Sequence, residues 1–71
     1  MYIVIEIQKN DQVATIVNSY ADRNVAEQKY HQILAAASVS SVQIHSAVML
    51  EEDGRLLKRE TYSHPIEVID E

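Results

Sequence analysis

The stretch VQIHSAVMLEEDGRLLKRETYS, residues 42–63, decides the fold. Two apolar-rich runs, 42–51 and 55–63, stand on either side of Asp53-Gly54, and Gly54 is the one glycine of the chain. An Asp-Gly pair between such runs is the strongest short-range signal for a β-hairpin, because a two-residue type I′ turn needs positive φ at both central positions. The sequence therefore predicts a hairpin over residues 42–63.

This turn decides which side chains share a face of the hairpin, because alternate residues of a strand point to opposite sides. The expected partners are Leu50 with Leu57, Val48 with Arg59 and His45 with Tyr62. One face then carries Val42, Ile44, Val48, Leu50 and Leu57. The other face carries His45, Ala47, Met49, Leu56 and Tyr62. Both faces are therefore partly apolar.

Two further strand-like runs open the chain, MYIVIEIQ at 1–8 and VATIVNSY at 13–20, with a polar turn at 9–12 between them. Both are rich in the β-branched and aromatic residues that strands favour. An even-length turn pairs Ile5 with Ile16. One face then carries Ile3, Ile5, Ile7, Ala14 and Ile16. The opposite face carries Tyr2, Val4, Val13, Thr15 and Val17, so this hairpin also has two apolar faces.

Helical spacing follows the first hairpin and extends to about Ala37. We expect Asp22 to be the N-cap, with its carboxylate accepting a bond from an early helix amide. Asn24 and Glu27 form a rival capping box. One buried stripe is predicted, made of Ala26, Tyr30, Ile33, Leu34 and Ala37.

These elements predict an α+β fold in the order β-β-α-β-β, with a four-stranded, mainly antiparallel sheet and one helix packed on one face. The single domain is expected to span 1–65, because Pro65 cannot donate a ladder hydrogen bond and should end the last strand. The acidic tail 66–71 would fray or add an edge strand. Strand order is left open.

One helix covers one face of a small sheet, so the other face needs a partner. The simplest arrangement puts the helix on the face of Ile3, Ile5 and Ile7. We then expect a homo-oligomer, most simply a dimer, with the opposite face at its interface. That predicted interface comprises Tyr2, Val4, Val13, Val17, Ala47, Met49, Leu56 and Tyr62. The sequence does not show whether the copies associate by stacking sheet faces or by joining sheet edges.

Composition restricts the other partners. The net charge is −5, from 11 acidic and 6 basic residues, which argues against nucleic-acid binding through phosphate contacts. No apolar run approaches the roughly 20 residues that span a membrane. The chain has no cysteine, which fits a reducing compartment, so a cytoplasmic location is expected.

No catalytic, cofactor or metal site is expected. The histidines His31, His45 and His64 lack the three or four convergent ligands of a metal site. Glu6 and Glu60 are carboxylates in the middle of strands. Ion pairing across strands accounts for their presence as well as a role in acid–base catalysis would. The protein is therefore expected not to be an enzyme. The alternative is a small-molecule or enzymatic site at a dimer interface, to which His45, Tyr62 and Glu60 would contribute.

Three segments carry a resemblance: MYIVIEIQ, AEQKYHQILAAASVSSV and HSAVMLEEDGRLLKRETYSH. Together they resemble a group of short, uncharacterised proteins encoded in prophage or mobile elements of gut bacteria. The resemblance brings no activity and no catalytic motif. It implies a small phage-related protein of a structural or assembly module, with other phage-related proteins as partners.

Overall fold

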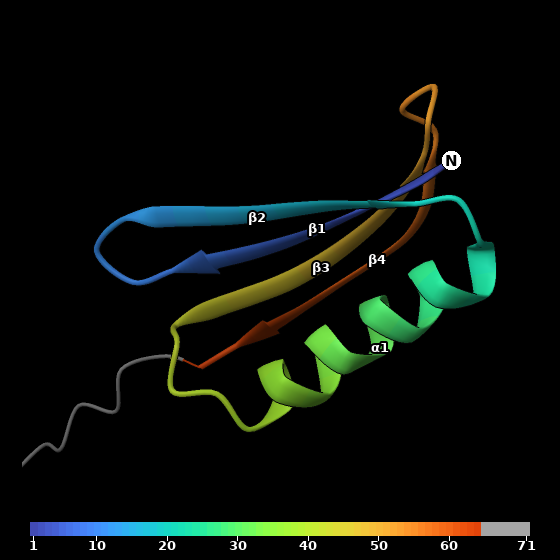
Figure 1. Ribbon diagram of the computed structural model, residues 1–71. Helices are drawn as coiled ribbons and strands as arrows, with labels where there is room; N and C mark the ends of the chain where they lie inside the picture. Colours follow the sequence, from blue (N-terminus) through green and yellow to red (C-terminus); the bar gives the residue numbers. More distant parts are fainter. Residues whose placement is uncertain (65–71) are drawn as a thin grey trace, which may run out of the picture.

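Within the described part of the chain, four antiparallel strands form one sheet, and a single helix packs along one of its faces (Figure 1). The computed structural model describes residues 1–64. The elements are β1 (Tyr2–Lys9), β2 (Val13–Tyr20), α1 (Arg23–Ser38), β3 (Ile44–Glu51) and β4 (Leu56–Ser63). The strand order is β2-β1-β3-β4. The predicted α+β fold is confirmed, whereas the predicted tail at 66–71 lies outside the described residues.

The first hairpin is one residue out of its predicted register. Its loop has an odd number of residues, 10–12, so Lys9 pairs with Val13 and Ile5 pairs with Val17 rather than with Ile16. The Asn10 side chain holds this loop, because its Oδ1 accepts a hydrogen bond from the Gln43 amide at 3.0 Å. A slip of one residue moves every side chain of a strand to the opposite face. The predicted faces of β2 are therefore wrong.

The second hairpin turns where predicted but with a longer loop. The Gly54 amide donates to the Glu51 carbonyl at 2.8 Å, and the Glu51 amide donates to the Arg55 carbonyl at 2.9 Å. Gly54 has φ of 92°, whereas Asp53 does not have positive φ. This is the three-residue loop in which a turn is followed by a glycine in the left-handed region, not a type I′ turn.

The extra loop residue explains the pairing beyond the turn. Leu50 pairs with Leu56 rather than with the predicted Leu57, and the register shifts between Met49 and Leu50. The shift restores the predicted pairing further along, with Val48 opposite Arg59 and His45 opposite Tyr62. A bulge therefore absorbs the difference between the two turn types.

Replacing Gly54 with alanine is expected to destabilise the protein by about 1–2 kcal/mol, because the left-handed region is unfavourable for a residue with a Cβ. An added Cβ would meet nothing within 4 Å, so the cost comes from the backbone alone. Urea unfolding measures it, and asparagine at the same position should cost less. Equal stability of the alanine variant and the natural chain would show that the turn does not require positive φ.

The helix agrees closely with its predicted pattern. Asp22 is the N-cap, and its Oδ1 accepts a hydrogen bond from the Asn24 amide at 2.8 Å. The predicted stripe is confirmed in full, since its five members are all buried: Ala26, Tyr30, Ile33, Leu34 and Ala37.

The helix covers the opposite face of the sheet from the one predicted. Val4, Ala47 and Met49 are each 0% exposed and form the core with the helix stripe. Tyr2 and Tyr62 pack against the same core and are partly buried. These five residues were predicted to lie at an oligomer interface. They lie instead on the helix-side face, which is the face of the sheet that α1 covers.

The chain connection gives the physical reason for this difference. β1 is antiparallel to both β2 and β3, so β2 and β3 are parallel and α1 connects them across β1. Such crossovers are right-handed in about 98% of cases, and this hand selects one face for the helix once the strand order is known. The residue types alone do not show which face the helix covers, because both faces of each hairpin are partly apolar.

Candidate functional site

The face of the sheet away from α1 is the most distinctive surface of the molecule. Cross-strand pairing places side chains in rows on this open face. One row is Val17, Ile5, Val48 and Arg59, and the next is Ser19, Ile3, Leu50 and Leu56. The rows at the other end are Thr15, Ile7, Ser46 and Thr61, then Val13, Lys9, Ile44 and Ser63. Nine of these residues are aliphatic, so the open face is mainly apolar.

No element of residues 1–64 covers the open face, as Figure 1 shows. Neighbouring side chains leave Ile3, Ile5 and Val48 half-buried in the middle of the sheet. The outer strands are more open, with Val17 59% exposed and Leu56 53% exposed. Isolated exposed aliphatic residues are ordinary, but a contiguous apolar patch marks an interaction surface.

Two polar residues near one end of the open face satisfy each other. The Ser46 and Thr61 hydroxyls share a hydrogen bond of 2.9 Å between β3 and β4. Ser46 is 7% exposed. Both hydroxyls keep this hydrogen bond when a partner covers them. The pair therefore adds little to the free-energy cost of burying the open face.

The carboxylates of the described strands lie away from the open face. The carboxylates of the described strands, Glu6, Glu51 and Glu60, all occupy helix-side rows. Lys9 and Arg59 are cationic and belong to open-face rows. A chain with a net charge of −5 therefore presents a sheet surface on which strand carboxylates do not repel a second copy.

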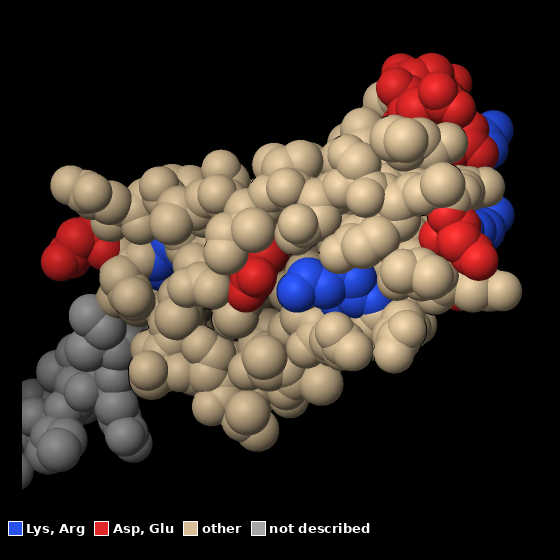
Figure 2. All heavy atoms as spheres, in the orientation of Figure 1, with Lys and Arg blue, Asp and Glu red and all other residues tan. Residues whose placement is uncertain are grey.

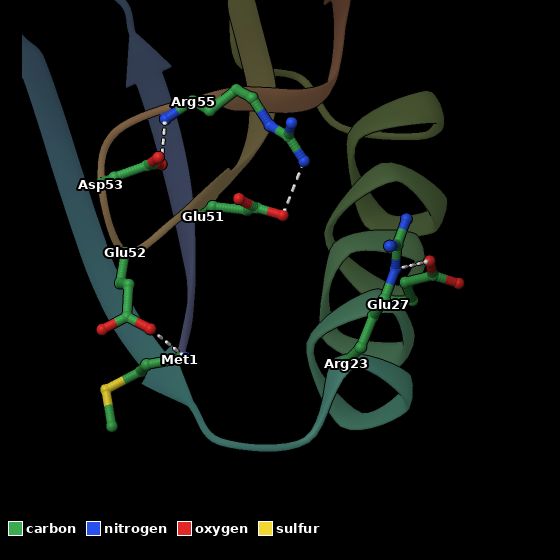
Figure 3. Close-up of polar contacts among 7 residues, drawn as sticks. All are labelled: Met1, Arg23, Glu27, Glu51, Glu52, Asp53 and Arg55. Atoms are coloured by element: carbon green, nitrogen blue, oxygen red, sulfur yellow. Dashed lines mark hydrogen bonds and ion pairs between the residues drawn. The ribbon is translucent and has the colours of Figure 1, made fainter.

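Acidic residues gather instead at the tip of the β3–β4 hairpin, where Figure 2 shows a cluster of red atoms. Figure 3 shows how they are paired. The Arg55 guanidinium donates to Glu51 at 2.8 Å, and the N-terminal amine of Met1 donates to Glu52 at 3.1 Å. The Arg55 amide donates to Asp53 at 3.0 Å. These contacts are exposed and contribute little to stability, so the tip is a solvated turn.

A buried polar pair lies on the helix-side face. His45 Nε2 and Glu6 Oε2 are 2.6 Å apart, and the two side chains are 5% and 15% exposed. The Gln8 side-chain amide donates to the same carboxylate oxygen at 2.9 Å. His45 Nδ1 is buried without a hydrogen-bond partner among the described residues. An ionised carboxylate only accepts hydrogen bonds, so His45 Nε2 is the donor to Glu6.

Several groups act on the ionisation of Glu6. Partial burial acts to raise its pKa, but hydrogen bonds from Gln8 and His45 and the charges of His45 and Lys29 outweigh it. The pKa of Glu6 is therefore lower than the ordinary value of 4.5. A lowered folded-state pKa stabilises the fold above the unfolded-state pKa, and this contribution is lost as the pH falls through the folded-state value.

A Glu6→Gln variant is expected to be about 1–2 kcal/mol less stable than the natural chain at pH 7, because it loses charge-assisted hydrogen bonds. The difference should shrink below about pH 4.5, where the natural carboxyl group takes up its proton. Urea unfolding between pH 7 and about pH 3 measures both curves. Curves that stay parallel through this range would contradict a stabilising Glu6 carboxylate.

The other candidate site residues do not converge on one place. His31 is exposed on α1, and His64 Nε2 donates to the Ala37 carbonyl at 2.8 Å. Glu60 lies in the same row as Glu6 with Ala47 between them, so two strand spacings of about 4.8 Å separate their backbones. Within residues 1–64 no three potential metal ligands come together and no pocket forms.

Tyr62 and His45 lie opposite each other on β4 and β3, on the helix-side face. The Tyr62 ring stacks on the His64 ring, with centroids 6.5 Å apart and an angle of 7° between the planes. The structure therefore places these residues against the helix side of the sheet, away from the open face.

The structure divides the predicted interface between the two faces. Val13, Val17 and Leu56 belong to open-face rows. The other five predicted residues pack on the helix side, as described above. Six residues of the open face were predicted to lie on the face that the helix covers. They are Ile3, Ile5, Ile7, Ile44, Val48 and Leu50. Their alternation with the core residues was visible in the sequence, but it did not show which set faces the helix.

Comparison with models of protein families found no match, and comparisons with curated proteins and with solved structures found none either. In the described part of the chain, α1 is neither long nor apolar enough to cross a membrane.

Proposed function

We propose that this protein is a non-enzymatic interaction protein that acts as a homo-oligomer, in which the open face of one copy covers the open face of another. The observation that carries this proposal is the unbroken apolar centre of that face. Ile5 lies between Val17 and Val48, and Ile3 lies beside Leu50, with no carboxylate in these rows.

The size of the open face suits a second copy. A strand of eight residues is about 26 Å long, and four strands cover a width of about 19 Å. The flat face therefore measures about 500 Å², and two stacked faces bury about 1,000 Å² in total. Specific protein–protein interfaces begin at about this buried area. Side chains protrude from the sheet, so the accessible surface that is buried is larger than the flat estimate.

Stacking two sheets is also a common solution for open apolar faces. Packed sheets lie about 10 Å apart with their strands rotated by about 30°. A two-fold axis between the sheets would place each α1 on the outside and the isoleucines of both copies at the centre. Such an assembly has four layers, helix, sheet, sheet and helix, and leaves neither sheet face in water.

The biological setting belongs to the same proposal. We infer a cytoplasmic protein, supported by the absence of cysteine from the chain, and a role in assembly among phage-related proteins, supported by the sequence resemblance. The excess of acidic residues supports protein partners rather than nucleic acid.

Sedimentation equilibrium over the micromolar range tests this function. We expect a mass at least twice the 8.1 kDa of one chain, and we expect association to persist in 1 M salt because apolar contacts are not screened. A single-chain mass at every concentration would overturn the proposal. Dissociation by salt would show that charges, rather than the open face, hold the copies together.

A further inference from the structure

The two edges of the sheet differ in how they are protected against pairing. Among residues 1–64, β2 and β4 are the edge strands, so each has a row of backbone groups that face no other described strand. Natural proteins protect such edges with charged side chains, proline or bulges. β4 has two of these devices, because it carries Lys58, Arg59 and Glu60 and has a register shift at its first residues.

β2 has none of these devices. Its sequence, VATIVNSY, contains no charged residue, no proline and no glycine over eight positions. The first five residues, from Val13 to Val17, are all exposed. Ile16 on the helix-side face is 50% exposed and Val17 on the open face is 59% exposed, so both sides of this strand are accessible. A long, uncharged and apolar edge is a template for pairing with another strand.

From this asymmetry we infer that β2 is a second interaction surface, and that it pairs in antiparallel fashion with β2 of another copy. The two sheets then join into one sheet of eight strands. This contact uses backbone groups at the edge of the sheet, so it goes beyond the proposed function, which uses side chains of the open face. Both contacts together would build an assembly larger than a dimer.

Symmetry makes β2 a suitable partner for itself. A two-fold axis perpendicular to the sheet keeps the open faces of both copies on the same side. Residues of the open face then lie opposite one another, as in the register in which Val17 faces its own equivalent and Thr15 faces Ser19. No pair of like charges arises, although the whole chain has a net charge of −5.

The helix leaves room for this pairing. In Figure 1, α1 lies below β3 and β4, and β2 is the strand farthest from it. Ala14 and Ile16, on the helix-side face of β2, are exposed rather than covered. A second sheet can therefore continue from β2 without meeting the helix of the first copy.

Amide hydrogen exchange of the assembled protein tests the pairing directly. In a free edge strand, alternate amides bond to β1 and exchange slowly, whereas the others face solvent and exchange quickly. Pairing of β2 should slow the second set by at least about tenfold. If the fast and slow amides still alternate while the assembly is intact, edge pairing is overturned and the open-face proposal stands. A protein that is monomeric at all concentrations overturns both.

A charge variant with a matched control completes the test. Ile16→Lys combined with Asn18→Lys adds two positive charges to the helix-side face of β2 and leaves the open face unchanged. Position 16 can face either position 16 or position 18 of the other copy, depending on the register of pairing. In both registers a lysine then lies opposite a lysine. We expect this variant to restore the alternation of fast and slow amides in β2. The control, Glu60→Lys, changes the charge by the same amount on β4 and should keep the uniform protection. Equal behaviour of the two variants would contradict pairing at β2.

Discussion

Replacing Met49 with aspartate is expected to unfold the protein at 25 °C. Met49 is 0% exposed and packs between the sheet and α1. The substitution removes an apolar side chain, at a cost of about 2–5 kcal/mol, and places a carboxylate in the core at further cost. A chain of 71 residues has a total stability of only about 4–10 kcal/mol. The neighbouring Lys58 offers little rescue, because its ammonium group lies 3.6 Å from Glu27 near the surface.

Circular dichroism and urea unfolding measure this result. Met49→Leu is the matched control, because it nearly conserves volume and should cost less than about 1.5 kcal/mol. The face assignment predicted from the sequence leads to the opposite result, since it places Met49 at an oligomer interface. A folded but monomeric Met49→Asp protein would therefore contradict the core described above.

Replacing Val48 with aspartate is expected to separate the stacked open faces and leave each copy folded. Val48 lies on the open face beside Ile5, with Arg59 on its other side. In a single copy the new carboxylate reaches water and Arg59, so we expect a cost of about 1 kcal/mol. In a stacked dimer each copy would bury one carboxylate. A cost of about 2 kcal/mol for each copy weakens the dimer roughly a thousandfold.

Sedimentation velocity measures the dissociation, and circular dichroism confirms that the variant is folded. Val25→Asp is the control, because Val25 is 44% exposed on α1 and lies away from the open face. The control should keep the mass of the natural assembly. If Val48→Asp assembles as tightly as the control, the open face does not lie at the interface.

Local sequence patterns predicted the elements of this fold well. The Asp-Gly pair located the second hairpin, and the spacing of Ala26, Tyr30 and Ile33 identified the buried side of the helix. Asp22 was correctly predicted as the N-cap. These features depend on interactions between residues a few positions apart, and the residue types of such a segment are sufficient to reveal them.

The sides of the sheet could not be predicted in the same way. The loop at 10–12 contains no glycine or proline that would specify its length, and its conformation depends on the distant amide of Gln43. The covered face depends on strand order, which arises from pairing between β1 and β3. The Glu6–His45 pair joins residues 39 positions apart, so no local spacing could have revealed it.

The most direct test of the proposed self-association is an NMR measurement on mixed copies, one isotope-labelled and one unlabelled. Isotope-filtered spectra select nuclear Overhauser effects between copies. We predict such effects from the methyl groups of Ile3, Ile5 and Ile7 to protons of the unlabelled copy, because these methyl groups lie at the centre of the stacked faces. The absence of these effects, together with broadening of the same methyl signals by a soluble paramagnetic agent, would show that the open face is in water and contradict the proposal.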